Sequence, residues 1–236
     1  MTAAVELRTA IIGLVAFASA EERMLLAASQ PGEAGDATCW AALPLIAHNA
    51  EFRGQQAERL AAIAEGRTPA DYGEIDHASP QVYEGYRAQA ADQVAVEASA
   101  SASDLLSRLA LISDEDLTEP DRNPWLKGRQ LWLQIIVRGF WHPTGHVLDY
   151  YLAHGQPDRA VALAAHAVAT ASYLNAPGPA HGMACYNLAC AQSRTGDLDQ
   201  AAATITEAIA LNPDLRANAA RDPDLQGLRG LVAPSQ

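Results

Sequence analysis

The sequence predicts an all-α fold in which a four-helix bundle is followed by a module of short helical repeats. Alanine occupies 50 of the 236 positions, whereas aromatic residues account for only 6%. Alanine has the highest helix propensity, and its small side chain lets neighbouring helices pack closely. Hydrophobic residues make up 49% of the chain and charged residues 19%, a composition typical of chains that fold around a core.

The net charge and the cysteines restrict the classes of function. Acidic residues number 28 against 16 basic ones, which gives a formal charge of −12 and argues against nucleic acid or an anionic membrane as a partner. The three cysteines, Cys39, Cys185 and Cys190, are odd in number and lack CxxC spacing. This pattern predicts neither a disulfide framework nor a zinc ribbon, so we expect a cytoplasmic protein.

The first helix is expected near the N-terminus, where apolar residues recur at spacings of three, four and seven. Residues 10–20 also resemble the apolar core and cleavage site of a signal peptide. Glu6 interrupts the basic start that such a peptide needs, and the apolar pattern continues beyond the cleavage site. We therefore predict a core helix. We find no apolar run of the roughly 18 residues that a membrane span needs.

The second helix is predicted from about residue 40 to residue 65. Residues 30–36 form a loop rich in helix breakers, and Asp36 or Thr38 is expected to cap the helix that follows. Gly66 is well placed to end it. The expected inner stripe consists of Leu43, Ile46 or Ala47, Ala50, Gln56 or Ala57, Leu60 and Ile63.

The third helix is expected from about residue 82 to residue 112, with a possible break in the alanine and serine stretch 98–103. An acidic, proline-containing loop follows, and the fourth helix begins near Leu131. Pro143 falls inside this helix, and the residue four positions earlier is Gly139, which relieves part of the crowding around a proline kink. We expect a bent helix.

A weak repeat with an offset of 41 residues begins near residue 146. The second copy resembles the tetratricopeptide pattern at six positions, and the first copy retains four residues of the pattern. These positions are Leu188, Gly196, Ala201, Ile205, Ala208 and Pro213 in the second copy, and Tyr151, Gly155, Ala160 and Ala167 in the first. The first copy is seven residues longer than the usual 34, so its second helix should be longer. The resemblance implies a peptide or protein partner for these repeats.

Three of the seven histidines suggest a metal site. His142 and His146 are four residues apart, which places both imidazoles on one face of a helix. The alternative interpretation is a pair of surface or aromatic-packed histidines, because such short spacings arise by chance. His48 lies in the middle of the second helix, just after an apolar run, where a polar side chain needs a partner or an exposed face.

The chain resembles the DinB superfamily of metal-binding bundles in three stretches. These are WAALPLIAHNAEF at residues 40–52, LISDEDL at 111–117 and GFWHPTGHVLDYY at 139–151. The resemblance covers residues 1–155 and implies an up-down-down-up four-helix bundle. The two tetratricopeptide-like repeats over residues 146–236, which come from the repeat pattern, would share the last helix of this bundle. The resemblance also implies that His48, His142 and His146 ligate a divalent metal, zinc or nickel, with at least one open coordination position. Several enzymes of the superfamily are oligomers, so a homodimer is expected.

Other residues near these positions allow two interpretations each. Glu51 and Asp149 lie three residues after a candidate ligand and are either orienting groups or helix-surface charges. Phe52 and Trp141 either line the cavity or belong to the core. His77 is interpreted as a loop residue.

The resemblance implies an S-transferase or isomerase that uses a low-molecular-weight thiol such as mycothiol or bacillithiol on a small electrophilic substrate, in stress response or detoxification. In such an enzyme a metal ion would lower the pKa of the thiol, so no protein nucleophile would be needed. We find no Ser-His-Asp set, no paired catalytic carboxylates and no phosphate-binding loop, and we assign no catalytic residue. The alternatives are a toxin-resistance hydrolase that activates water, and an interaction protein whose metal site is structural or vestigial.

Overall fold

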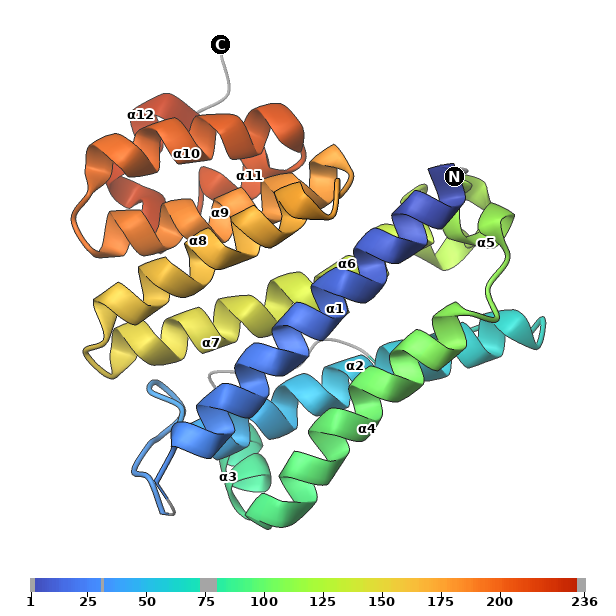
Figure 1. Cartoon of the computed structure of the whole chain (residues 1–236), viewed down its shortest axis with the longest axis horizontal. Coiled ribbons are helices and arrows are strands. Elements are labelled where there is room, and N and C mark those ends of the chain that lie inside the picture. Colours follow the sequence, from blue (N-terminus) through green and yellow to red (C-terminus); the bar gives the residue numbers. More distant parts are fainter. Residues whose placement is uncertain (1–2, 31, 73–79, 233–236) are drawn as a thin grey trace. The chain divides into compact units, whose positions relative to one another are not determined.

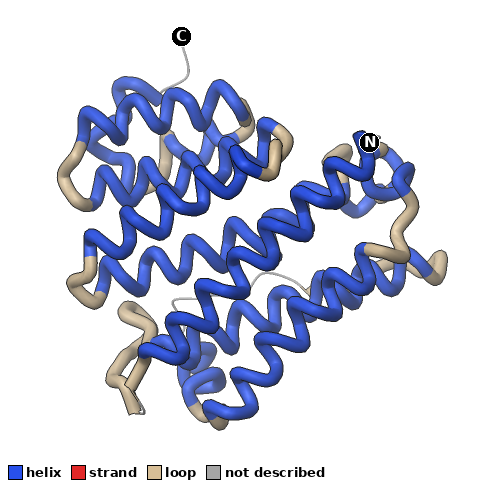
Figure 2. Tube along the Cα trace, in the orientation of Figure 1, coloured by secondary structure: helices blue, strands red, loops and turns tan. Residues whose placement is uncertain are grey.

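The structure is a computed structural model that describes residues 3–30, 32–72 and 80–232, and all regular secondary structure in these ranges is helical (Figures 1 and 2). The prediction of an all-α protein is therefore confirmed. The α-helices are α1 (Ala3–Ala28), α2 (Ala42–Ala64), α3 (Pro80–Arg87), α4 (Ala91–Leu109), α5 (Asp114–Thr118), α6 (Leu131–Ile136), α7 (His142–Ala153), α8 (Pro157–Tyr173), α9 (Gly178–Arg194), α10 (Leu198–Leu211), α11 (Leu215–Ala219) and α12 (Arg229–Val232). Short 3-10 turns occupy Pro120–Arg122, Pro124–Leu126 and Pro223–Leu228.

The chain divides into two compact units, one of residues 15–150 and the other of residues 1–14 together with 151–236. In the first unit, α2 and α4 form the most extensive helix pair. The predicted inner stripe of α2 is buried at Ile46, Ala47, Ala50, Gln56, Ala57 and Leu60, whereas Leu43 and Ile63 are half-buried. From α4, Leu105 and Leu109 pack into the same core, each at most 1% exposed.

The start of α2 differs from the prediction. Asp36 does not cap the helix: its Oδ1 accepts hydrogen bonds from the amides of Thr38 and Cys39 within the preceding turn. The first amide of α2, that of Ala42, instead donates to Oε2 of Glu33 at 2.9 Å. A carboxylate from the loop thus satisfies an amide that the helix itself leaves without a partner. The end of the helix is as predicted, because Gly66 follows it with a φ of +68°.

The third predicted helix is two helices, and the break lies earlier than expected. The chain leaves α3 after Arg87 and enters α4 at Ala91, with Ala90 in an extended conformation. The alanine and serine stretch 98–103 is regular α-helix. Its small residues Ala98 and Ala102 are buried, so this part of α4 packs in the core and the helix continues without a break.

The fourth predicted helix is α6 and α7 joined by a π-helical turn, Val137–Trp141. The irregularity lies just before Pro143, which has no amide to donate to the preceding turn. The hydroxyl of Thr144 donates to the carbonyl oxygen of Phe140 at 2.7 Å and also lies within hydrogen-bond distance of that of Trp141, at 3.0 Å. Gly139 lies within the turn, where a Cβ atom would come within 2.7 Å of Cγ2 of Val15. The glycine therefore also permits close packing against α1.

In the second unit, α9 packs against both α8 and α10. The four alanines of the repeat pattern, Ala160, Ala167, Ala201 and Ala208, are at most 2% exposed. Gly155 and Gly196, which correspond in the two copies, have φ values of +69° and +90°. As expected, α8 is longer than α10, with 17 residues against 14. These features describe packed helical hairpins with a shared turn geometry.

The sequence prediction that no apolar run is long enough to span a membrane is wrong for α1. An 18-residue window of this helix has a mean hydropathy of 1.6, so α1 is long and apolar enough to cross a membrane by length and composition. A third of that window is buried in the structure. Core helices and signal sequences share this length and composition, so one such helix is weak evidence for a membrane span.

Candidate metal centre

The three histidines predicted from the sequence come together in the unit of residues 15–150. His48 lies in the middle of α2, and His142 and His146 lie one turn apart on α7. Nε2 of His142 is 3.0 Å from Nε2 of His48 and 3.1 Å from Nε2 of His146. His48 is fully buried, whereas the other two are half-buried, so one side of the group reaches toward solvent.

The donor chemistry of the group suits a metal ion. A neutral imidazole Nε2 carries either one proton or one lone pair, so His142 can make a good hydrogen bond to only one of its two neighbours through this atom. A metal cation, in contrast, can accept a lone pair from each of the three Nε2 atoms. Imidazole nitrogens about 2.1 Å from a shared ion lie roughly 3.0 to 3.4 Å apart. The two separations fall in that range, so His48, His142 and His146 could hold a metal ion.

A hydrogen-bonded chain lies behind His48. Nδ1 of His48 is 3.4 Å from the hydroxyl oxygen of Tyr86, and this hydroxyl donates to Oε2 of Glu51 at 2.7 Å. Because the tyrosine proton is directed to the carboxylate, the hydroxyl oxygen can accept a hydrogen bond from a protonated Nδ1. That tautomer leaves the lone pair of Nε2 directed at the other two histidines. Burial and the bond to Glu51 raise the pKa of Tyr86, so it remains a donor at neutral pH.

Aromatic rings surround the buried side of the group. Phe52 stacks on His142 with ring centroids 4.8 Å apart and also contacts His48 at 4.4 Å. Trp40 meets the rings of His48 and Tyr86 at 5.6 and 5.8 Å. Of the two aromatics for which the sequence left a choice, Phe52 is therefore a wall of the site, and Trp141 is half-buried. These rings fix the orientation of the imidazoles and keep water from the inner side.

Two arginines place positive charge beside this wall. The guanidinium carbon of Arg138 lies 4.2 Å above the ring of Phe52, and that of Arg59 lies 5.5 Å from the ring centroid of Trp125. Burial, together with the charge of Arg59, lowers the pKa of Arg138 to about 10. Within the described residues, Nη1 of Arg138 and Nε of Arg59 are buried without a hydrogen-bond partner. Arg59 already lies near the carboxylate of Asp71, whereas Arg138 has an unused donor beside a second cation, which favours an anionic group near Arg138.

Tyr86 is the site residue that sequence reasoning missed. It lies 38 residues from His48 and on a different helix, so no spacing rule connects the two. The available signal was the pair Tyr83 and Tyr86, which share one face of a short helix and are both buried. Glu51 is exposed, and its carboxylate accepts the hydrogen bond from Tyr86. Asp149 is exposed. His77 lies outside the described residues.

A second group with metal-ligand chemistry lies in the other unit. Cys190, Asp222 and Asp224 place one donor atom each within 4.8 Å of one another. The hydroxyl of Tyr186 donates to Asp222 at 2.6 Å, and Arg194 lies 3.4 Å from Asp224. Protein groups therefore already satisfy both carboxylates, and the group is readily explained as a link between α9 and the 3-10 turn.

Comparison of the chain with protein-family models, with curated proteins and with solved structures gave no match. The resemblance to the DinB superfamily therefore depends on the residues quoted above. What the structure adds is an all-helical protein with a largely buried three-histidine group that could hold a metal ion.

Proposed function

We propose that this protein holds a divalent transition metal, zinc or nickel, at His48, His142 and His146 and transfers a low-molecular-weight thiol to small electrophiles. The observation that supports this most strongly is the convergence of three Nε2 atoms, one of them fixed from behind by Tyr86. Three neutral nitrogen ligands are the set found in open, catalytic sites rather than closed, structural ones. The assignment of the chemistry follows the DinB resemblance.

An ion bound by these histidines would supply the positive charge that lowers the pKa of a thiol substrate. The chain would contribute position and access. Tyr86 and Glu51 would keep His48 in the tautomer that offers Nε2. Phe52 and Trp40 would close the inner side of the site, so that substrates approach from the half-buried side of His142 and His146.

The position of Arg138 indicates that the thiol or the electrophile carries a negative charge. Its guanidinium lies on Phe52, the ring that also stacks on His142. An arginine with an unused donor binds a carboxylate well, because its planar group can donate two parallel hydrogen bonds. We therefore favour a thiol with carboxylate groups, such as bacillithiol, over an uncharged one, such as mycothiol.

Metal analysis of the purified protein tests the site. The parent should contain a transition metal close to one equivalent, before or after reconstitution, and the double variant His142→Ala, His146→Ala should contain almost none. The matched control is His154→Ala, His166→Ala, which removes two histidines outside the group and should keep the metal. A parent that takes up no metal after reconstitution would overturn both the transferase and a hydrolase.

Activity separates the remaining catalytic versions. We expect turnover of a thiol with a chlorinated aromatic electrophile, lost in the double variant and retained in the control. Turnover of an ester or amide without thiol would instead support the hydrolase, in which water takes the place of the thiol.

An interaction function is the second candidate, and the packed hairpins of α8, α9 and α10 are the observation that favours it. Their regular small-residue contacts resemble repeats that bind peptides or another subunit. A homodimer with normal assembly in the metal-free double variant, combined with no thiol-transfer activity in the metal-loaded parent, would favour this function over the transferase.

A further inference from the structure

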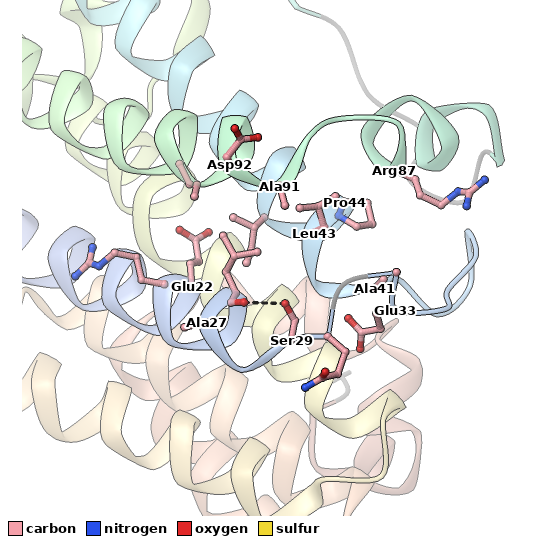
Figure 3. Close-up of a pocket in the computed structure, with 17 residues that line it drawn as sticks. Glu22, Ala27, Ser29, Glu33, Ala41, Leu43, Pro44, Arg87, Ala91 and Asp92 are labelled. Atoms are coloured by element: carbon pink, nitrogen blue, oxygen red, sulfur yellow. Dashed lines mark hydrogen bonds between the residues drawn. The ribbon is translucent and has the colours of Figure 1, made fainter.

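A cavity of about 730 Å³ lies among α1, α2 and α4 in the unit of residues 15–150 (Figure 3). Most of its lining is apolar, with Leu26 from α1, Leu43 and Ile46 from α2, and Ala95 and Ala98 from α4. None of the three histidines lines it. A volume of this size falls in the range of about 300 to 1,000 Å³ that is typical of pockets for small organic molecules.

Glu22 is the most deeply buried charged residue of this lining. It lies on α1 and is 1% exposed, and Figure 3 shows its side chain leaving α1 toward the space between α1 and α4. Oε2 lies 2.7 Å from Nη1 of Arg53, which is itself fully buried. Oε1 has no hydrogen-bond partner within the described residues. A buried carboxylate oxygen without a donor is costly, so a ligand that supplies a donor there would gain binding energy.

The charges around the cavity indicate the sign of that ligand. Glu22 is neutralised by Arg53, and Arg87, which points away from the cavity in Figure 3, pairs with Glu84 at 2.7 Å. Of the other charged residues that line the cavity, Glu33 and Asp92 are negative and Arg23 is positive. The balance is negative, as in the chain as a whole, and a negative site attracts cations.

We propose that this cavity binds a small molecule with an apolar body and a primary ammonium head, and that the head donates a hydrogen bond to Oε1 of Glu22. The apolar lining would bury the body of the ligand, and the acidic groups would select its charge. A fatty acid of equal length would bring a carboxylate, which has no proton to donate to Oε1, into a lining whose net charge is negative, and would be rejected. This site is separate in its residues from the proposed metal centre, so either proposal can fail without the other.

Calorimetric titration of the full chain with decylamine, decan-1-ol and decanoate tests the proposal, because the three probes share a chain length and differ in the head group. Decylamine should bind to one site at least tenfold more tightly than decan-1-ol, and decanoate should not bind measurably. The same titration of the His142→Ala, His146→Ala variant should give unchanged decylamine affinity, which excludes coordination of the amine to a metal.

Variants locate the binding. Ala95→Phe places a ring in the cavity from the exposed side of α4 and should weaken decylamine binding at least tenfold. Ala100→Phe puts the same ring on the same helix, outside the cavity lining, and should bind like the parent. Glu22→Gln should reduce the preference for the amine over the alcohol. If Glu22→Gln does not fold, the decylamine affinities of Ala95→Phe and Ala100→Phe still show whether the amine binds in this cavity.

Three results would overturn the proposal. One is equal affinity for all three probes, which would reduce the site to an unselective apolar cavity. Another is decylamine binding that Ala95→Phe leaves unchanged, and the third is no detectable decylamine binding to the folded parent.

Discussion

The hydroxyl oxygen of Tyr86 lies 3.4 Å from Nδ1 of His48, and this contact joins the short helix α3 to the most buried member of the histidine group. The same hydroxyl donates to Glu51, one turn after His48 on α2. A tyrosine between a carboxylate and an imidazole fixes both the ring orientation and the tautomer. Tyr86 is therefore a positioning residue for the proposed metal centre.

Replacing Tyr86 by phenylalanine should weaken metal binding by about 10-fold, the lower end of the range for groups that orient a ligand. The ring and its packing against Trp40 would remain, while Nδ1 of His48 would lose its acceptor. Competition for the metal with a chromophoric chelator measures this affinity. Glu51→Gln should weaken metal binding less than Tyr86→Phe does, because the glutamine oxygen can still accept a hydrogen bond from the tyrosine hydroxyl.

The matched control for this prediction is Tyr83→Phe, which removes a hydroxyl from the same helix. Tyr83 is 1% exposed and contacts Trp40, but its hydroxyl is not bonded to a histidine. This variant should bind metal like the parent. Equal metal affinity of Tyr86→Phe and Tyr83→Phe would show that the Tyr86 hydroxyl does not position His48.

Gly139→Ala should destabilise the protein by about 1 to 3 kcal/mol, the usual cost of adding a methyl group to a closely packed site. The new Cβ would come within 2.7 Å of Cγ2 of Val15 and 3.1 Å of Cδ2 of Leu105. Because neither atom can move freely in the core, the π-helical turn would have to shift. Urea unfolding measures the loss.

Gly54→Ala is the control for this glycine. Gly54 lies inside α2, and a Cβ there would meet no atom within 4 Å. Alanine should therefore stabilise the helix by about 0.5 to 1 kcal/mol through its higher propensity. A Gly139→Ala variant that gains stability like Gly54→Ala would contradict the steric explanation.

Sequence reasoning found the histidines because their signal is local. The four-residue spacing of His142 and His146 determines their common face on any helix. His48 stands out in the sequence because it is a polar residue that follows an apolar run. The convergence of α2 and α7 does not follow from spacing, and only the family resemblance suggested it. Tyr86 had neither signal, since its role arises from packing between helices that are separated by a long connection.

The errors in the predicted elements also have physical causes. The sequence predicts a possible break in the alanine and serine stretch 98–103. In the structure the Ser101 hydroxyl donates to the carbonyl oxygen of Ala98 and also accepts from Arg53, and Ala98 and Ala102 pack in the core, so the helix continues through the stretch. Likewise, the distant carboxylate of Glu33 caps α2, and no local motif could indicate it.

The cysteines should differ sharply in reactivity. Cys185 is 1% exposed, and burial raises the pKa of its thiol to about 11, so at pH 8 it has almost no thiolate to react. Cys39 is half-buried on the loop before α2. Iodoacetamide followed by mass spectrometry should therefore modify Cys39 first in the folded protein.

Cys185 and Cys190, both buried, should react only after unfolding in denaturant, which serves as the control that all three thiols can be modified. Modification of Cys185 in the folded state at the rate of Cys39 would show that this part of α9 opens readily. Slow modification is also what a transferase that takes its thiol from a substrate would show, because no protein thiol is needed.

Removing one partner of the ion pair between Glu22 and Arg53 should lower the free energy of unfolding strongly, whereas replacing both partners by apolar residues should lower it little. Its side chains are 2% and 0% exposed, and Arg53 also donates to Ser101 and to the carbonyl oxygen of Ala98. Removing one partner strands a buried charge, so Arg53→Met should cost about 3 to 5 kcal/mol. The double variant Glu22→Leu, Arg53→Met removes both charges and should recover most of that loss. Urea unfolding of the parent, both single variants and the double variant gives the coupling directly, and additive losses would mean that the two side chains do not form a pair in solution.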